Sequence, residues 1–274
     1  MLKKHKKLPK RPDRSVHKSV IRVDEQIING SVFADVAPAN QYALLLLGHI
    51  FHEISWLQRM LYIGQKNIDA ASQIEKDGQA LQLMFLVRLM LGKLIEFDTL
   101  LRDERKIDSF LAANFAPESP ADGRAAIDSV RTLFASNDWI RKARNKHFNH
   151  YPVFNDVKTA LSHVNEEWDF RVYYGERSTH TLYATADAFA NLAWLNLADA
   201  EDPARGLNNG LEVLLSIAGE ALVMIELALG HYLRGPLARE GDTKQIALAV
   251  RPLSEQRFDF FSDLEEEKPQ SRSD

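Results

Sequence analysis

Cysteine is absent from this chain of 274 residues. Its absence excludes disulfide bonds, a thiolate nucleophile and any metal site with cysteine ligands. A chain without cysteine is also typical of the reducing cytoplasm, where we expect this protein to act.

Several motifs of common enzymes are missing too. Neither Gly-x-Gly-x-x-Gly, Gly-x-x-x-x-Gly-Lys nor Gly-x-Ser-x-Gly occurs, so the sequence favours neither a nucleotide-binding loop nor a serine hydrolase. The stretch HIFHEISW is similar to a zinc-protease helix, but Trp56 occupies the position of the second histidine. His49 and Glu53 share a helical face and could ligate a metal, although a polar edge on an apolar helix is the preferred interpretation. We therefore predict no metal and no cofactor.

Apolar residues, by contrast, recur with the period of a helix. Between residues 40 and 65 they fall three or four positions apart, as Leu44, Leu47, Phe51, Ile54, Leu57 and Leu61. Similar patterns and cap residues predict further helices over residues 79–101, 125–134, 138–151, 184–197 and 207–233. The sequence thus predicts a mainly α fold, an antiparallel helical bundle with a small β-hairpin insertion.

Three short segments favour β structure. Asn29-Gly30 lies between apolar runs and suits a type I′ turn, because both residues tolerate positive φ. Aromatic residues and valine flank Gly175 in WDFRVYYGERSTHTLYA, which predicts a hairpin over residues 168–184. Residues 244–250, KQIALAV, are expected to form a short strand.

Charge is segregated at the two ends of the chain, although the net charge is only −4. The start, MLKKHKKLPKRPDR, is basic, and the end, SDLEEEKPQSRSD, is acidic. No apolar segment follows the basic start, so we expect no secretory signal. The predicted organisation is a basic arm with a short hairpin over residues 1–35, a helical bundle over 36–236, and an extension with an acidic tail over 237–274.

The most apolar stretch, residues 211–233, is long enough to cross a bilayer. Glu212, Glu220 and Glu226 lie inside it, and an acidic residue at the bilayer centre costs about 2.5–3.5 kcal/mol. We therefore predict a buried helix of a soluble protein and no membrane partner.

Candidate functional residues are concentrated in RKARNKHFNHYP, residues 141–152. On a helix Arg144, His147 and His150 lie three apart along one ridge, beside the pair Asn145 and Asn149. A helix end of this kind can also be purely structural, because the helix dipole favours cations at the C-terminus.

Guanidinium, imidazole and amide groups together match the needs of RNA cleavage without a metal. Attack of a 2′-hydroxyl on the adjacent phosphate requires a base for its proton and an acid for the leaving 5′-oxygen. Histidine serves either role near neutral pH, and arginine stabilises the negative charge that gathers on the phosphorus. An asparagine can hold a phosphate oxygen or orient the histidine.

The stretch ARNKHFNHYP resembles the Arg-polar-x(3–5)-His signature of HEPN domains, particularly the abortive-infection-like branch. The two long helices before it, with VRLMLGKLIEF in the second, are similar to the same bundle. The resemblance implies Arg144, Asn145 and His150 as catalytic residues. It also implies a helical dimer whose two motif helices face each other across a cleft, forming one composite ribonuclease site.

A rival frame uses the same spacing one turn earlier. Arg141 with His147 also fits it, but Lys142 then follows the arginine where the family has a polar residue.

Two functions follow as hypotheses. The first is a metal-independent endoribonuclease of phage defence or toxin–antitoxin growth arrest, a homodimer with RNA as substrate and an antitoxin or regulatory protein as a further partner. The second is a non-catalytic helical adaptor that binds RNA or another protein; the basic start is compatible with both.

Overall fold

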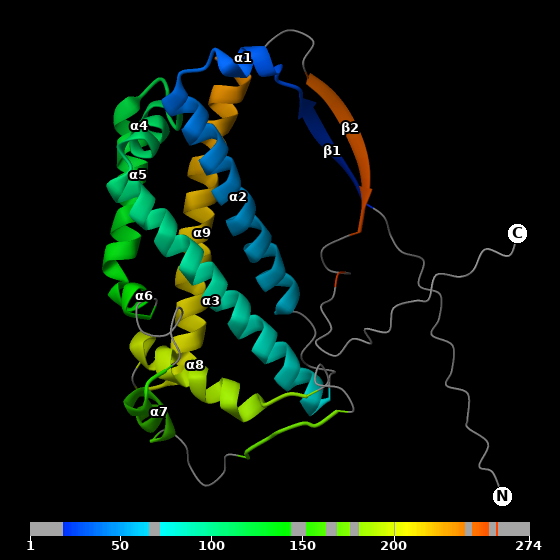
Figure 1. Ribbon diagram of the computed structural model, residues 1–274, viewed down its shortest axis with the longest axis vertical. Coiled ribbons are helices and arrows are strands. Elements are labelled where there is room, and N and C mark those ends of the chain that lie inside the picture. Colours follow the sequence, from blue (N-terminus) through cyan, green and yellow to red (C-terminus); the bar gives the residue numbers. More distant parts are fainter. Residues whose placement is uncertain are drawn as a thin grey trace, which may run out of the picture.

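The computed structural model describes residues 19–65, 72–143, 152–162, 169–175, 181–199, 201–238, 243–251 and 256 (Figure 1). Over these residues the chain is mainly helical with one small antiparallel sheet, which confirms the predicted fold class. In chain order the elements are β1 (Ser19–Gln26), α1 (Gly30–Ala34), α2 (Pro38–Gly64), α3 (Gln73–Asp103), α4 (Arg105–Asn114), α5 (Pro120–Ser136), α6 (Asp138–Ala143), α7 (Phe154–Leu161), α8 (Ala184–Ala198), α9 (Pro203–Arg234) and β2 (Thr243–Val250).

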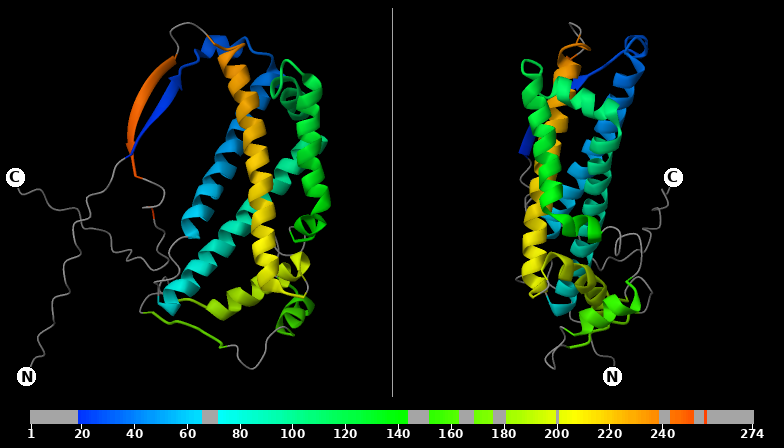
Figure 2. Two further views of the ribbon diagram at one scale, coloured as in Figure 1. Left: turned by 180° about the vertical axis from the view of Figure 1, so that it is seen from behind. Right: turned by 90° about the vertical axis from the view of Figure 1, so that its left-hand side faces the viewer.

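The long helices α2, α3 and α9 form the bundle together with α4 and α5 (Figures 1 and 2). Their apolar stripes meet in one core, whose fully buried side chains include Leu47, Ile54, Met90, Leu94 and Ile217. The local sequence sets the helix starts. Pro38 opens α2, and the side chain of Glu75 accepts hydrogen bonds from the backbone and the hydroxyl of Ser72 at the start of α3.

The helix α9 runs through this core. It contains the one described segment, Arg205–Arg234, that is long and apolar enough to cross a membrane. Its apolar stripe packs against α2, α4, α5 and α8, whereas Glu212, Glu220 and Glu226 are exposed on the opposite side. Of the helix predicted over residues 211–233, the structure thus buries one face in the bundle and leaves the other exposed.

The sequence does not reveal α4 and α7. Only Glu104 separates α3 from α4, and its side chain caps α4 by accepting a hydrogen bond of 3.1 Å from the backbone of Lys106. No glycine or proline marks this boundary, so the periodicity carries no sign that a new helix begins.

The small sheet does not form around the turn residues from which the sequence predicts a hairpin. The expected hairpin at Asn29-Gly30 is wrong, because the side chain of Asn29 accepts the backbone N–H of Ser31 and caps α1. The expected strand over residues 244–250 is confirmed as β2, which pairs with β1. Of the hairpin expected over 168–184, the structure shows one antiparallel bridge, between Tyr173 and Leu182, and residues 176–180 lie outside the described part.

The ribbon of β1 and β2 is amphipathic. The register pairs Ile21 with Leu248 and Val23 with Ile246, so these four apolar side chains share one face. None of the four packs on the hydrophobic core that the described residues form. Figures 1 and 2 show the ribbon bowed away from the helices.

Candidate functional site

The predicted catalytic residues Arg144, Asn145 and His150, and the alternative His147, lie outside the described residues. The structure describes the helix that leads directly into them. The structure describes this helix, α6, as far as Ala143, and its side chains Ile140 and Ala143 are buried. The start of the candidate stretch is therefore fixed to the bundle.

A buried carboxylate fastens α6 to α3. Asp98 of α3 is 2% exposed, and its Oδ2 accepts a hydrogen bond of 2.7 Å from Nη2 of Arg141. Its Oδ1 accepts one of 2.9 Å from Nε of Arg102, one helical turn further along α3. A buried charge requires such partners, because it has lost its hydration. Asp98 thus joins α6 to α3.

This ion pair also bears on the rival frame. The guanidinium of Arg141 is engaged by Asp98, and the whole Arg141 side chain is only about one third exposed. An arginine that contacts a phosphate must present its donors to the substrate. The structure therefore favours a positioning role for Arg141, which leaves Arg144 as the better candidate for phosphate contact.

Aromatic stacking holds the other side of α6. The rings of Trp139 on α6 and Trp194 on α8 stack with centroids 6.3 Å apart and planes inclined by 14°. Glycine at position 210 of α9 makes room for this pair, since a Cβ there would lie 3.3 Å from Cη2 of Trp139. The buried indole of Trp194 donates from Nε1 to Oδ1 of Asn191 at 3.1 Å.

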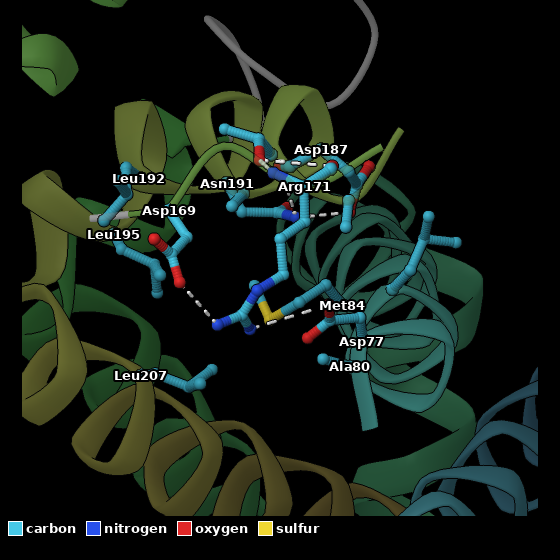
Figure 3. Close-up of a pocket in the computed structure, with 14 residues that line it drawn as sticks. Asp77, Ala80, Met84, Asp169, Arg171, Asp187, Asn191, Leu192, Leu195 and Leu207 are labelled. Atoms are coloured by element: carbon cyan, nitrogen blue, oxygen red, sulfur yellow. Dashed lines mark hydrogen bonds and ion pairs between the residues drawn. The ribbon is translucent and has the colours of Figure 1, made fainter. Parts of the chain in front are cut away.

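A cavity of about 340 Å³ lies between α3, α8 and the segment before α8 (Figure 3). Its polar centre is Arg171, whose Nη2 donates to Oδ2 of Asp169 at 3.0 Å and whose Nη1 lies 4.0 Å from Oδ2 of Asp77. The hydroxyl of Tyr173 donates to the same oxygen of Asp77 at 2.8 Å. Apolar side chains, including Met84 on α3, complete the wall.

The described wall includes a further carboxylate, Asp187, which lies in the first turn of α8. Its Oδ2 accepts a hydrogen bond of 2.9 Å from Nδ2 of Asn191, and its Oδ1 lies 4.0 Å from Nη2 of Arg88. Burial raises the pKa of the Asp187 carboxyl, although the charge of Arg88 and the bond from Asn191 lower it. The loss of hydration is therefore only partly offset.

Sequence reasoning did not find this cavity. Its charged residues come from α3, from the segment at residues 169–175 and from α8, and no fixed spacing connects them. When only their neighbours in sequence are considered, these charged residues resemble ordinary solvated surface residues.

On α2, the possible metal ligands His49 and Glu53 lie beside each other, and Glu53 is also paired with a lysine. Oε2 of Glu53 lies 3.6 Å from Nε2 of the exposed His49, and its Oε1 lies 2.7 Å from Nζ of Lys93 on α3. Within the described part of the chain, histidine and carboxylate side chains do not gather in groups of three or more that could hold a metal.

No protein-family model, curated protein or solved structure matches this chain. Its function is therefore inferred from its own residues.

Proposed function

We propose that this chain is a metal-independent endoribonuclease of the HEPN type that acts as a homodimer. The observation that carries the proposal is the position of the Arg144–His150 stretch directly after α6, a helix that Asp98 and Arg141 fasten to the core. A site that handles a phosphate benefits from a rigid support, because misplacement of the reacting groups slows the reaction.

In this proposal each catalytic residue of the stretch has a separate role. His150 exchanges protons with the attacking 2′-hydroxyl or the leaving 5′-oxygen, and its twin in the second protomer serves as the other proton carrier. Arg144 neutralises the charge on the phosphoryl oxygens, and Asn145 holds a phosphate oxygen or orients the histidine. The products are a 2′,3′-cyclic phosphate and a free 5′-hydroxyl.

The ribbon of β1 and β2 supports the homodimer. Its apolar face, formed by Ile21, Val23, Ile246 and Leu248, meets no core helix among the described residues. A two-stranded ribbon is marginal by itself in water. Two copies related by a two-fold axis would bring the same face together and bury it as sheets do in a sandwich.

Sedimentation or light scattering tests this assembly. Leu248→Lys places a charge in the apolar face and is expected to shift the protein toward the monomer. Ala249→Lys is the matched control, because its side chain lies on the opposite face of the same strand. A monomeric wild-type protein at micromolar concentration would argue against a composite site.

The activity is tested by incubation of the purified protein with RNA in EDTA. We expect cleavage with 2′,3′-cyclic phosphate ends, and a loss of about a hundredfold or more in Arg144→Ala and in His150→Ala. Arg59→Ala and His52→Ala are matched controls that remove the same side-chain types from exposed positions of α2. Equal cleavage by all four variants would contradict the proposed site.

The alternative, a non-catalytic helical adaptor, makes the opposite prediction in the same assay. RNA then stays intact but shifts in a gel, or a partner protein binds without any change to RNA. The ribonuclease reading further implies a cytoplasmic protein of phage defence or growth arrest, whose activity an antitoxin or regulatory protein restrains.

A further inference from the structure

We propose that the cavity between α3 and α8 binds a small amphipathic cation, an amine or amidine on a compact apolar body, with Asp187 as its counter-charge. This binding site is separate from the proposed ribonuclease site and does not depend on it.

The charge balance of the wall points to a cation. Among the described residues that line the cavity, three carboxylates, Asp77, Asp169 and Asp187, stand beside one guanidinium, that of Arg171. Figure 3 shows that guanidinium reaching between Asp169 and Asp77, so its own charge is already compensated. An anionic ligand would have to displace one of these carboxylates, whereas a cation adds to the attraction of the wall.

Of these three carboxylates, Asp187 would gain the most hydrogen bonding from a bound cation. Within the described part of the chain it pairs with Nη2 of Arg88, which is 4.0 Å from Oδ1 and so beyond hydrogen-bond distance. Asn191 supplies one neutral donor to Oδ2 and is itself fixed by Trp194. A ligand N–H group at Oδ1 would restore the hydrogen bonding that burial removes from the carboxylate.

The remainder of the wall selects an apolar body. Leu81 and Met84 line it from α3, and Leu192 and Leu195 line it from α8. A cavity of about 340 Å³ lies near the lower end of the range for small-molecule sites. It is suited to one aromatic ring or a short alkyl chain with a single charged group.

Calorimetric titration of the full chain with benzamidine tests the proposal. Neutral benzamide and anionic benzoate have almost the same shape, so they separate the charge from the ring. We expect benzamidine to bind with a dissociation constant of about 1 mM or below, and the two analogues to bind about tenfold more weakly or not at all.

Two variants locate the binding. Asp187→Asn keeps the shape of the side chain and should raise the dissociation constant about tenfold, while Asp128→Asn, an exposed carboxylate on α5, should leave it unchanged. Ala80→Phe fills the cavity from an exposed position of α3 and should abolish binding without a change of charge. Thermal melts verify that each variant is folded.

The measured affinities decide whether the cavity is a cation site. Equal affinity for benzamidine and benzamide, tighter binding of benzoate, or full affinity in folded Ala80→Phe would overturn the proposal. No heat at millimolar benzamidine would overturn it as well. None of these results bears on RNA cleavage, which is measured separately.

Discussion

Arg141 on α6 and Asp98 on α3, 43 residues apart in the sequence, are joined by a hydrogen bond of 2.7 Å at the edge of the core. The carboxylate is buried, whereas the guanidinium of Arg141 and that of Arg102 are partly exposed. This asymmetry determines which partner is costly to remove. An arginine that loses Asp98 can turn toward water, but Asp98 without its arginines stays buried with an uncompensated charge.

We therefore expect the double variant Arg102→Gln/Arg141→Gln to be less stable than the wild type by about 3–5 kcal/mol. Asp98→Asn should lose less, about 1–3 kcal/mol, because it removes the buried charge itself. Urea unfolding at neutral pH measures both differences. If Asp98→Asn proves the more damaging change, the carboxylate is better solvated than its burial indicates.

Two glycines offer a sharper comparison of packing. At Gly123, near the start of α5, an added Cβ would overlap the carbonyl oxygen of Ala112 and lie 3.1 Å from its carbonyl carbon. At Gly92, in the middle of α3, an added Cβ meets no atom within 4 Å. The first site needs glycine for the close approach of α4 and α5, and the second does not.

Gly123→Ala should therefore destabilise the chain by about 1–3 kcal/mol, because the backbone of α4 must move. Gly92→Ala should stabilise it by about 0.5–1 kcal/mol, because alanine restricts the unfolded chain and favours the helix. Chemical denaturation of the two variants side by side measures the difference. A loss of stability in both would show that Gly92 also permits a close contact, for example with a second copy of the chain.

The helices of this fold are easier to predict from a single sequence than its turns. Helix periodicity located α2, α3, α5, α8 and α9, because each buries a continuous apolar stripe. Turn residues were a poorer guide. Asn29 serves equally well in a hairpin and as a helix cap, and its role depends on what lies on either side.

Long-range pairing is the part that local sequence does not encode. The partner of β2 is β1, more than two hundred residues earlier, and nothing in KQIALAV specifies SVIRVDEQ as its neighbour. The same holds for the cavity, whose charges come from three separate segments. Short-range chemistry, by contrast, is visible in the sequence. The Arg and His side chains of residues 141–150 indicate the ribonuclease hypothesis, and the structure adds a buried carboxylate, Asp98, that contacts Arg141 at the start of this stretch.

The carboxyl groups at the two ends of α8 have pKa values shifted in opposite directions, so we expect pH to affect their contributions to stability in opposite ways. Asp187 in the first turn has a pKa raised by burial. Asp199, the C-cap, has a pKa lowered to about 2, first by its bond to Nε of Arg205 and then by the backbone N–H of Asp202. Among the described residues, Arg88, Asp77, Asp169 and Arg171 carry the charges near Asp187, and the attraction of Arg88 offsets the effect of burial on the pKa only in part.

The sign of each contribution follows from proton linkage. For Asp187 the folded state binds its proton more tightly than the unfolded chain, whose aspartate pKa is about 3.9. Its contribution to stability is thus complete below the unfolded pKa and is lost as the pH rises through the folded value. For Asp199 the contribution is complete above the unfolded pKa and is lost as the pH falls toward about 2.

Urea unfolding of Asp187→Asn, Asp199→Asn and wild type between pH 3 and pH 7 separates the two effects. Relative to wild type, Asp187→Asn should gain stability as the pH rises, since the amide cannot acquire the charge that burial penalises. Asp199→Asn should be less stable than wild type at pH 7, since the amide forms no ion pair with Arg205, and this deficit should shrink as the pH falls below about 4, where wild type also begins to lose the contribution. Parallel curves for Asp187→Asn and wild type would mean that solvent, Arg88 and Asn191 together fully compensate the burial of the Asp187 carboxylate, which would remove the electrostatic reason for a cation in the cavity.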